Sequence, residues 1–171
     1  MRNIWTMMGA ACLILLAGCS SAPAGSDYEE TEAEAPPEQA EISGYVMEQE
    51  GSSILVVTPT TESEEKGRAM WVSEAPDNEW TGKYVDVWTD GPIKESFPEQ
   101  APADKVSEVE MSEVEGARLT TSEALASALT DVEDDKIVAV AEILFDEDDD
   151  QWQIVLKENE GPEKEVLVED E

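Results

Sequence analysis

Short β-rich segments bounded by turn residues constrain the fold of this 171-residue chain most strongly. Between residues 42 and 97, five segments have strand length and are rich in Val, Ile, Tyr and Trp. They are ISGYVM (42–47), SILVV (53–57), AMWVS (69–73), YVDVW (84–88) and the weaker IKESF (93–97). Turn residues separate them, for example Gly51 and the Asp90-Gly91-Pro92 sequence. Five such strands predict a small antiparallel sheet or a partly closed barrel of the oligonucleotide/oligosaccharide-binding (OB) type.

The last third of the chain predicts one helix and three more strands. The helix begins with a capping-box pattern, in which Thr120 accepts from the amide of Glu123 and Glu123 reaches back. Apolar residues then recur at helical spacing, at Leu125, Ala128, Leu129 and Val132. The strand candidates are KIVAVAEILF (136–145), QWQIVL (151–156) and KEVLV (164–168). The fold class is therefore mainly β or α+β, with a β-domain (42–110) followed by a helix plus three-stranded meander (119–171).

The first residues of the chain have the layout of a secretory signal peptide. Arg2 supplies the positive charge, and a mostly apolar stretch runs from Ile4 to Ala17. This stretch is shorter than the roughly 20 residues that a transmembrane helix needs. Residues 1–18 therefore predict a leader that directs export and is removed.

The end of that leader reads Leu16-Ala17-Gly18-Cys19. This motif resembles the lipobox of bacterial lipoproteins at all four positions. The resemblance implies that a diacylglycerol group is attached to the thiol of Cys19 and that cleavage makes Cys19 the mature N-terminus. Two acyl chains anchor a protein far more firmly than one, since each buried methylene contributes about 0.8 kcal/mol. We expect the protein at the outer face of the cytoplasmic membrane; the alternative is an ordinary cleaved signal peptide with an incidental cysteine.

A polar segment separates Cys19 from the β-domain. Residues 20–41 are rich in Ser, Ala, Pro, Gly and Glu and contain almost no large apolar side chains. Such a segment cannot bury enough surface to offset its ordering entropy. Residues 19–41 are therefore predicted to be the lipidated cysteine and a disordered tether, which would span roughly 25 Å.

Several motifs between residues 42 and 110 match a family pattern in combination. They are Gly44–Val46, Ile54–Val57, Trp71, Gly82–Trp88, Asp90-Gly91 and Glu95–Ala101. Together they resemble a small domain of unknown function, DUF3221, found in exported lipoproteins of Bacillus and its relatives. The resemblance supports the lipoprotein prediction and implies no activity. The helix and meander that follow faintly resemble half of a peptidase-propeptide PepSY module.

The composition excludes several function classes. Acidic residues outnumber basic ones by 42 to 10, and the net charge of -32 repels nucleic acids and anionic lipid headgroups. The chain has no histidine, and its only cysteines, Cys12 and Cys19, lie in the leader region. These absences exclude Ser-His-Asp and Cys-His catalysis and the usual zinc sites. We therefore expect no nucleic-acid partner and no cofactor.

Two local features of the sequence suggest a binding site. The run Asp146–Asp150 suggests a calcium loop, but Gln151 and Lys157 occupy the positions where an EF-hand needs Gly and Glu. We interpret it as a solvated turn, with at most weak association of divalent cations. Among the tryptophans downstream of the leader, Trp80 lies in the turn-rich sequence DNEWTGK instead of a strand. Trp80 is therefore the best candidate among them for an exposed tryptophan that contacts a glycan or peptide.

These features together predict an exported, membrane-anchored lipoprotein that acts as a non-enzymatic binding or interaction module. Its partner would be an envelope protein or a glycan, and no catalytic or metal-ligating residue is assigned. Two alternatives stay open. The PepSY-like tail suggests an envelope stress or protease-modulating factor, and paired carboxylates could serve a hydrolase of wall polymers.

Overall fold

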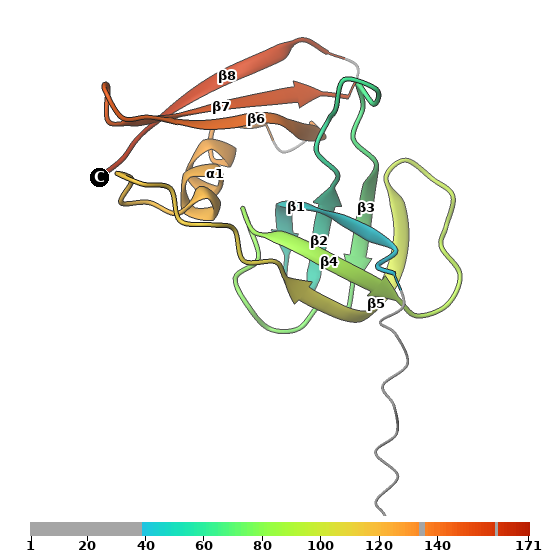
Figure 1. The fold of residues 1–171 in the computed structure, drawn as a ribbon. Coiled ribbons are helices and arrows are strands. Elements are labelled where there is room, and N and C mark those ends of the chain that lie inside the picture. Colours follow the sequence, from blue (N-terminus) through green and yellow to red (C-terminus); the bar gives the residue numbers. More distant parts are fainter. Residues whose placement is uncertain (1–38, 134–135, 160) are drawn as a thin grey trace, which may run out of the picture. The chain divides into compact units, whose positions relative to one another are not determined.

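The computed structural model describes residues 39–133, 136–159 and 161–171 (Figure 1). The predicted signal peptide, Cys19 and most of the predicted tether lie outside the described residues. The described residues form one compact unit. Its elements are β1 (Ile42–Glu50), β2 (Ser53–Val57), β3 (Ala69–Ser73), β4 (Tyr84–Thr89), β5 (Glu99–Glu108), α1 (Thr121–Leu129), β6 (Val138–Asp146), β7 (Gln151–Glu158) and β8 (Glu163–Glu169).

The first five strands close into a barrel with the order β1-β2-β3-β5-β4. Antiparallel pairing of β1 with β4 closes the barrel, and β3 and β5 form its parallel pair. The β1–β2 hairpin turns at Gly51 and Ser52, where Gly51 adopts a φ of 60° that glycine accepts without strain. The prediction of an OB-like barrel within a mainly β fold is confirmed.

The predicted position of the fifth strand is wrong. Residues 93–97 lie in the connection between β4 and β5, and the strand is Glu99–Glu108 instead. Its sequence, EQAPADKVSE, has little intrinsic strand preference. Residues 99–108 form a strand because β3 and β4 offer hydrogen-bonding edges on both sides. The strand therefore depends on pairing with segments distant in the sequence, which local strand propensity cannot predict.

Apolar side chains fill the interior of the barrel. The buried cluster consists of Ile42, Val46, Ile54, Val56, Met70, Val72, Ala75, Trp80, Val85, Val87 and Ala101. The choice of Trp80 as the candidate for an exposed tryptophan is therefore wrong, since this side chain is only 4% exposed. Its indole N–H donates to the carbonyl of Pro76 at 2.8 Å, so the ring can be buried with its one polar atom satisfied.

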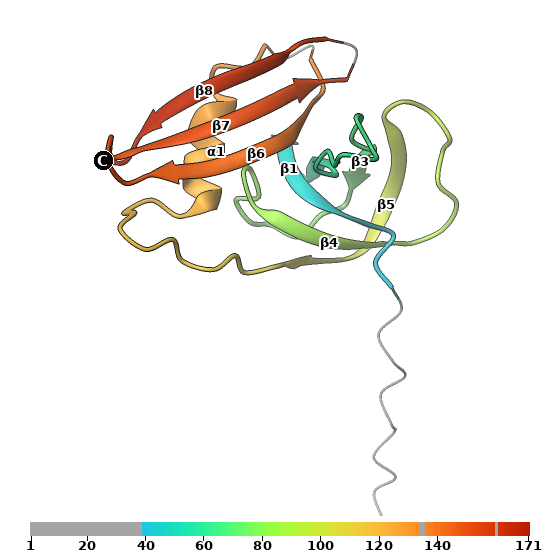
Figure 2. The ribbon, with the colours of Figure 1, turned by 45° about the horizontal axis from the view of Figure 1, so that its top comes forward.

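The second half of the unit is helix α1 packed on one face of the antiparallel sheet β6-β7-β8 (Figures 1 and 2). The predicted capping box is present: Glu123 N–H donates to Thr120 Oγ1 at 3.2 Å, and Thr120 N–H donates to Glu123 Oε2 at 2.8 Å. The helix ends at Leu129, before the last residue of the predicted apolar series. The three predicted strands are confirmed, with their ends shifted by at most two residues.

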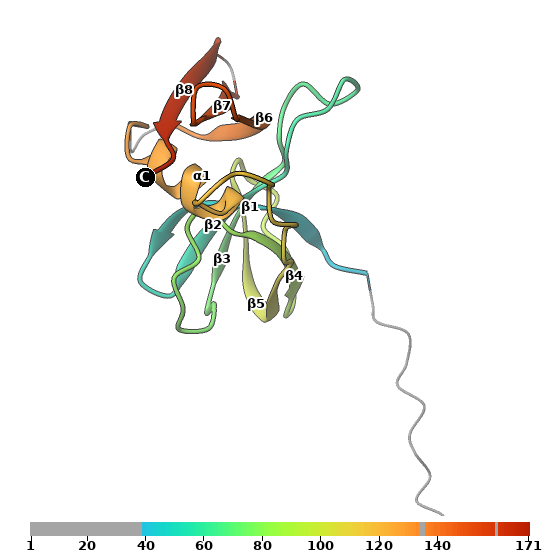
Figure 3. The ribbon, with the colours of Figure 1, turned by 60° about the vertical axis from the view of Figure 1, so that its left-hand side comes forward.

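A second apolar core joins the barrel to α1 and the three-stranded sheet. Figure 3 shows α1 between the barrel strands and β6–β8. It contains outward-facing barrel residues such as Leu55, helix residues such as Leu125 and sheet residues such as Trp152. The helix lies directly against the barrel at Gly82, where an added Cβ would clash with the Ser122 carbonyl. One side of the barrel is therefore covered by the C-terminal half of the same unit.

Candidate functional site

The face that OB barrels commonly use for binding is not open in this protein. In that fold, ligands bind over the second and third strands. Here Leu55 and Val57 of β2 and Ala69 of β3 are at most 2% exposed, because they belong to the core shared with α1 and β6–β8. The side of the barrel formed by these residues is therefore not available to a ligand.

An open pocket lies on the barrel around the end of β4. It has a volume of about 350 Å³ and is lined by Gln39, Glu41, Trp88, Thr89 and Asp104. We call it the Trp88 pocket. Strand alternation explains the position of the indole: Val85 and Val87 of β4 point into the barrel, so the half-buried Trp88 lies on the outer side.

A bulge in β5 brings a carboxylate to this pocket. Trp88 pairs with Lys105, whereas the next residue, Thr89, pairs with Ala103. Asp104 is the extra residue between the two partners, and a bulge of this kind redirects a side chain. The exposed carboxylate of Asp104 thereby lies at the rim of the pocket.

A cation also contacts the indole. The Nζ of Lys105 lies 4.6 Å from the centroid of the Trp88 ring, within the range of a cation–π interaction. The pocket therefore combines an aromatic surface with carboxylates, a hydroxyl, an amide and one nearby ammonium group. This set can contact the apolar face of a ligand and form hydrogen bonds around its edge.

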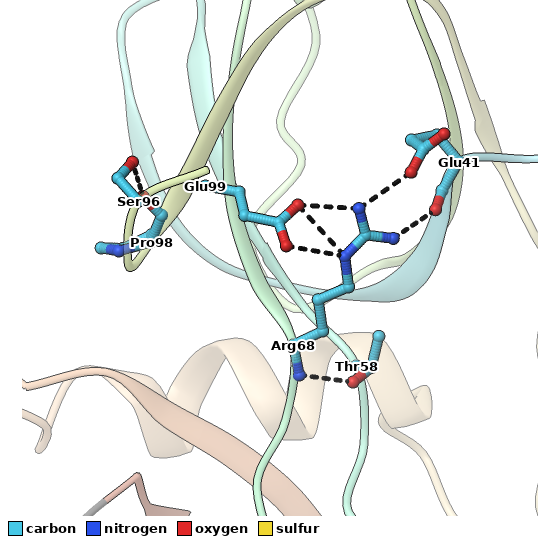
Figure 4. A network of polar contacts seen from close by, with 6 residues as sticks. All are labelled: Glu41, Thr58, Arg68, Ser96, Pro98 and Glu99. Carbon is cyan, nitrogen blue, oxygen red and sulfur yellow. Dashed lines mark hydrogen bonds and ion pairs between the residues drawn. The ribbon is translucent and has the colours of Figure 1, made fainter. Parts of the chain in front are cut away.

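Arg68 holds one residue of the pocket, Glu41, in place (Figure 4). Its guanidinium donates to the carboxylate of Glu99, with Nη2–Oε2 at 2.7 Å. It also donates to Glu41 twice, from Nη1 to the carbonyl oxygen at 2.7 Å and from Nη2 to Oε1 at 2.8 Å. Hydrogen bonds to Glu99 raise the pKa of Arg68, and those to Glu41 add to the effect, so the guanidinium stays charged. This network ties the segment that enters the barrel to β5 and fixes Glu41 beside Trp88.

The acidic run at Asp146–Asp150 forms the turn between β6 and β7, as expected. The Oδ1 atom of Asp146 accepts from the backbone N–H groups of Asp148 at 3.0 Å and Asp149 at 3.3 Å. The carboxylate thus stabilises its own turn. Within the described ranges, no group of three or more acidic side chains is placed to hold a metal ion.

Sequence reasoning missed one buried carboxylate. Asp170 is 1% exposed and accepts from Arg118 N at 2.6 Å, Leu119 N at 2.8 Å and Trp152 Nε1 at 3.1 Å. Burial raises the pKa of Asp170, but these hydrogen bonds and the charge of Arg118 outweigh burial and hold the pKa below its ordinary value. Nothing local in a run of acidic residues indicates which one is buried. We assign Asp170 a structural role, joining the end of the sheet to the segment before α1.

The remaining predicted site residues, Leu16 to Cys19, lie outside the described residues. In the part of the chain that the structure describes, no helix is long and apolar enough to cross a membrane.

Residues 43–110 match the model of the family described as "Protein of unknown function (DUF3221)". The match spans nearly the whole barrel and excludes α1 and β6–β8. It confirms the resemblance seen in the strand motifs. No curated protein matches the chain, and no solved structure matches it.

Proposed function

We propose that this protein is a non-enzymatic binding module, anchored to the outer face of the cytoplasmic membrane through a lipid on Cys19. The lipobox motif Leu16-Ala17-Gly18-Cys19 supports the anchor. The polar composition of residues 20–38 supports a tether between the lipid and the barrel. The module would thereby sample ligands near the membrane without requiring contact with the headgroups.

The Trp88 pocket is the proposed ligand site, and the half-buried indole beside two carboxylates is the observation that carries the proposal. An indole face packs against the apolar face of a sugar ring. Glu41, Thr89 and Asp104 can accept hydrogen bonds from sugar hydroxyl or amide groups. The strongly acidic protein repels anionic polymers and so weakens their binding. We therefore propose a neutral or amino-bearing glycan as the ligand.

Titration of the full-length chain in non-ionic detergent with a tetramer of N-acetylglucosamine tests this proposal. We expect saturable binding, measured by calorimetry, that Trp88→Ala weakens by at least about tenfold. Phe97→Ala is the matched control, because Phe97 is 56% exposed and lies outside the pocket. The same incubation is assayed for new reducing ends.

Three results would contradict the proposal. If the wild type and Trp88→Ala bind the tetramer with equal affinity, the Trp88 pocket is not the binding site. The absence of binding to the tetramer would remove the glycan class. Release of reducing ends would show hydrolysis and would replace binding with catalysis.

A further inference from the structure

The three-stranded sheet has one face that α1 covers and one that carries exposed apolar side chains. Cross-strand pairing places Leu144 of β6, Gln153 of β7 and Leu167 of β8 in one row. Leu144 is 49% exposed and Leu167 is 53% exposed. The next row holds Val155 between Glu142 and Glu165. We call the face that contains these two rows the outer face.

The core beneath the sheet does not explain why the outer face carries apolar side chains. Alternate residues of the same strands, including Trp152, Ile154 and Val166, point to the opposite face and are buried in the shared core. A solvated sheet face normally carries polar side chains at the alternate positions. Single exposed leucines are ordinary, but here two leucines and a valine lie in adjacent rows across three strands, around the uncharged side chain of Gln153.

The surroundings of this area are acidic. By strand alternation, the outer face also carries Asp146, Glu163 and Glu169, in addition to Glu142 and Glu165. The only lysine in these paired positions is Lys157, which forms an ion pair with Glu163 at 3.3 Å. The outer face therefore has an apolar centre and a negatively charged border.

We infer that the outer face binds a basic segment of a partner protein, one that presents Lys or Arg side chains around an apolar side chain. An apolar centre with complementary charges at its border is the arrangement of many protein interfaces. A second copy of this chain would bring the same carboxylates and would be repelled. This inference does not depend on the proposed function of the Trp88 pocket, because the two surfaces share no strand.

Binding of a synthetic peptide, Ac-KLKLKLK-NH2, to the full-length chain in non-ionic detergent at 150 mM salt tests the inference. We expect the double variant Leu144→Ser/Leu167→Ser to weaken binding by about tenfold or more. The matched control is Met111→Ser/Val114→Ser, which removes apolar side chains of similar exposure, 44% and 38%, from the segment before α1. A second pair compares Glu142→Gln/Glu165→Gln with Glu113→Gln/Glu115→Gln. A thermal melt of each variant verifies that it is folded.

The expected pattern is loss of binding in both outer-face variants and retention in both controls. Equal weakening by the control pairs, or equal binding of the leucine-free peptide Ac-KGKGKGK-NH2, would show nonspecific attraction to an acidic protein and would overturn the inference. Sedimentation that shows a dimer of the free chain, lost in Leu144→Ser/Leu167→Ser, would assign the outer face to a second copy instead.

Discussion

Leu125 of α1 lies where the barrel, the helix and the three-stranded sheet meet, and Leu125→Ala tests whether they unfold together. Its side chain is fully buried, in the cluster that also contains Leu55 of β2 and Trp152 of β7. Removing a fully buried leucine side chain costs the lost transfer free energy and leaves a cavity, together about 3–5 kcal/mol. For a chain of this length, that loss lowers the melting temperature by roughly 10–15 °C.

Urea unfolding of the full-length chain, followed by tryptophan fluorescence and far-ultraviolet circular dichroism, measures this effect. Both signals should show one transition, displaced equally by the substitution, because the shared core couples the barrel to the sheet. Leu167→Ala is the matched control, and its 53% exposed side chain should cost less than about 1 kcal/mol. Two separate transitions, only one of which responds to Leu125→Ala, would refute the coupling.

Three further predictions concern other parts of the chain. Cys19→Ala should accumulate as a longer precursor that incorporates no labelled palmitate, as judged by gel mobility and radiolabel; normal processing would refute the lipobox interpretation. Because the pKa of Asp170 is lowered in the folded protein, its contribution to stability is present above the ordinary aspartate pKa and is lost as the pH falls through the folded value. Wild-type melting temperatures should therefore fall below about pH 4 more steeply than those of Asp170→Asn, and parallel curves would contradict this assignment. Gly82→Ala should lower the free energy of unfolding in urea by about 1–3 kcal/mol. Gly82 has a φ of 84°, and an added Cβ would lie 2.8 Å from the amide nitrogen of Ala126 in α1. A stability equal to that of the wild type would show that α1 does not pack against Gly82.

The placement of the candidate site illustrates where sequence reasoning failed. The turn-rich surroundings of Trp80 made it the best sequence candidate for an exposed tryptophan, whereas Trp88 lies within the predicted strand 84–88. The structure reverses their exposure: Trp80 is buried in the barrel core, whereas Trp88 is only half-buried and lines a pocket. The position of a residue on a strand or loop does not determine which neighbours cover it, because those neighbours come from distant parts of the chain.

The sequence by itself determined the local elements: seven of the eight strands, the helix with its Thr120 capping box, and the DUF3221 match of the barrel segment. These depend on alternation, turn residues and caps, which act between residues near in the chain. Only the tertiary structure decided that residues 99–108 form the fifth strand, and that α1 and the sheet cover β2 of the barrel. Both outcomes depend on pairing and burial between segments far apart in the sequence, for which local propensity carries no signal.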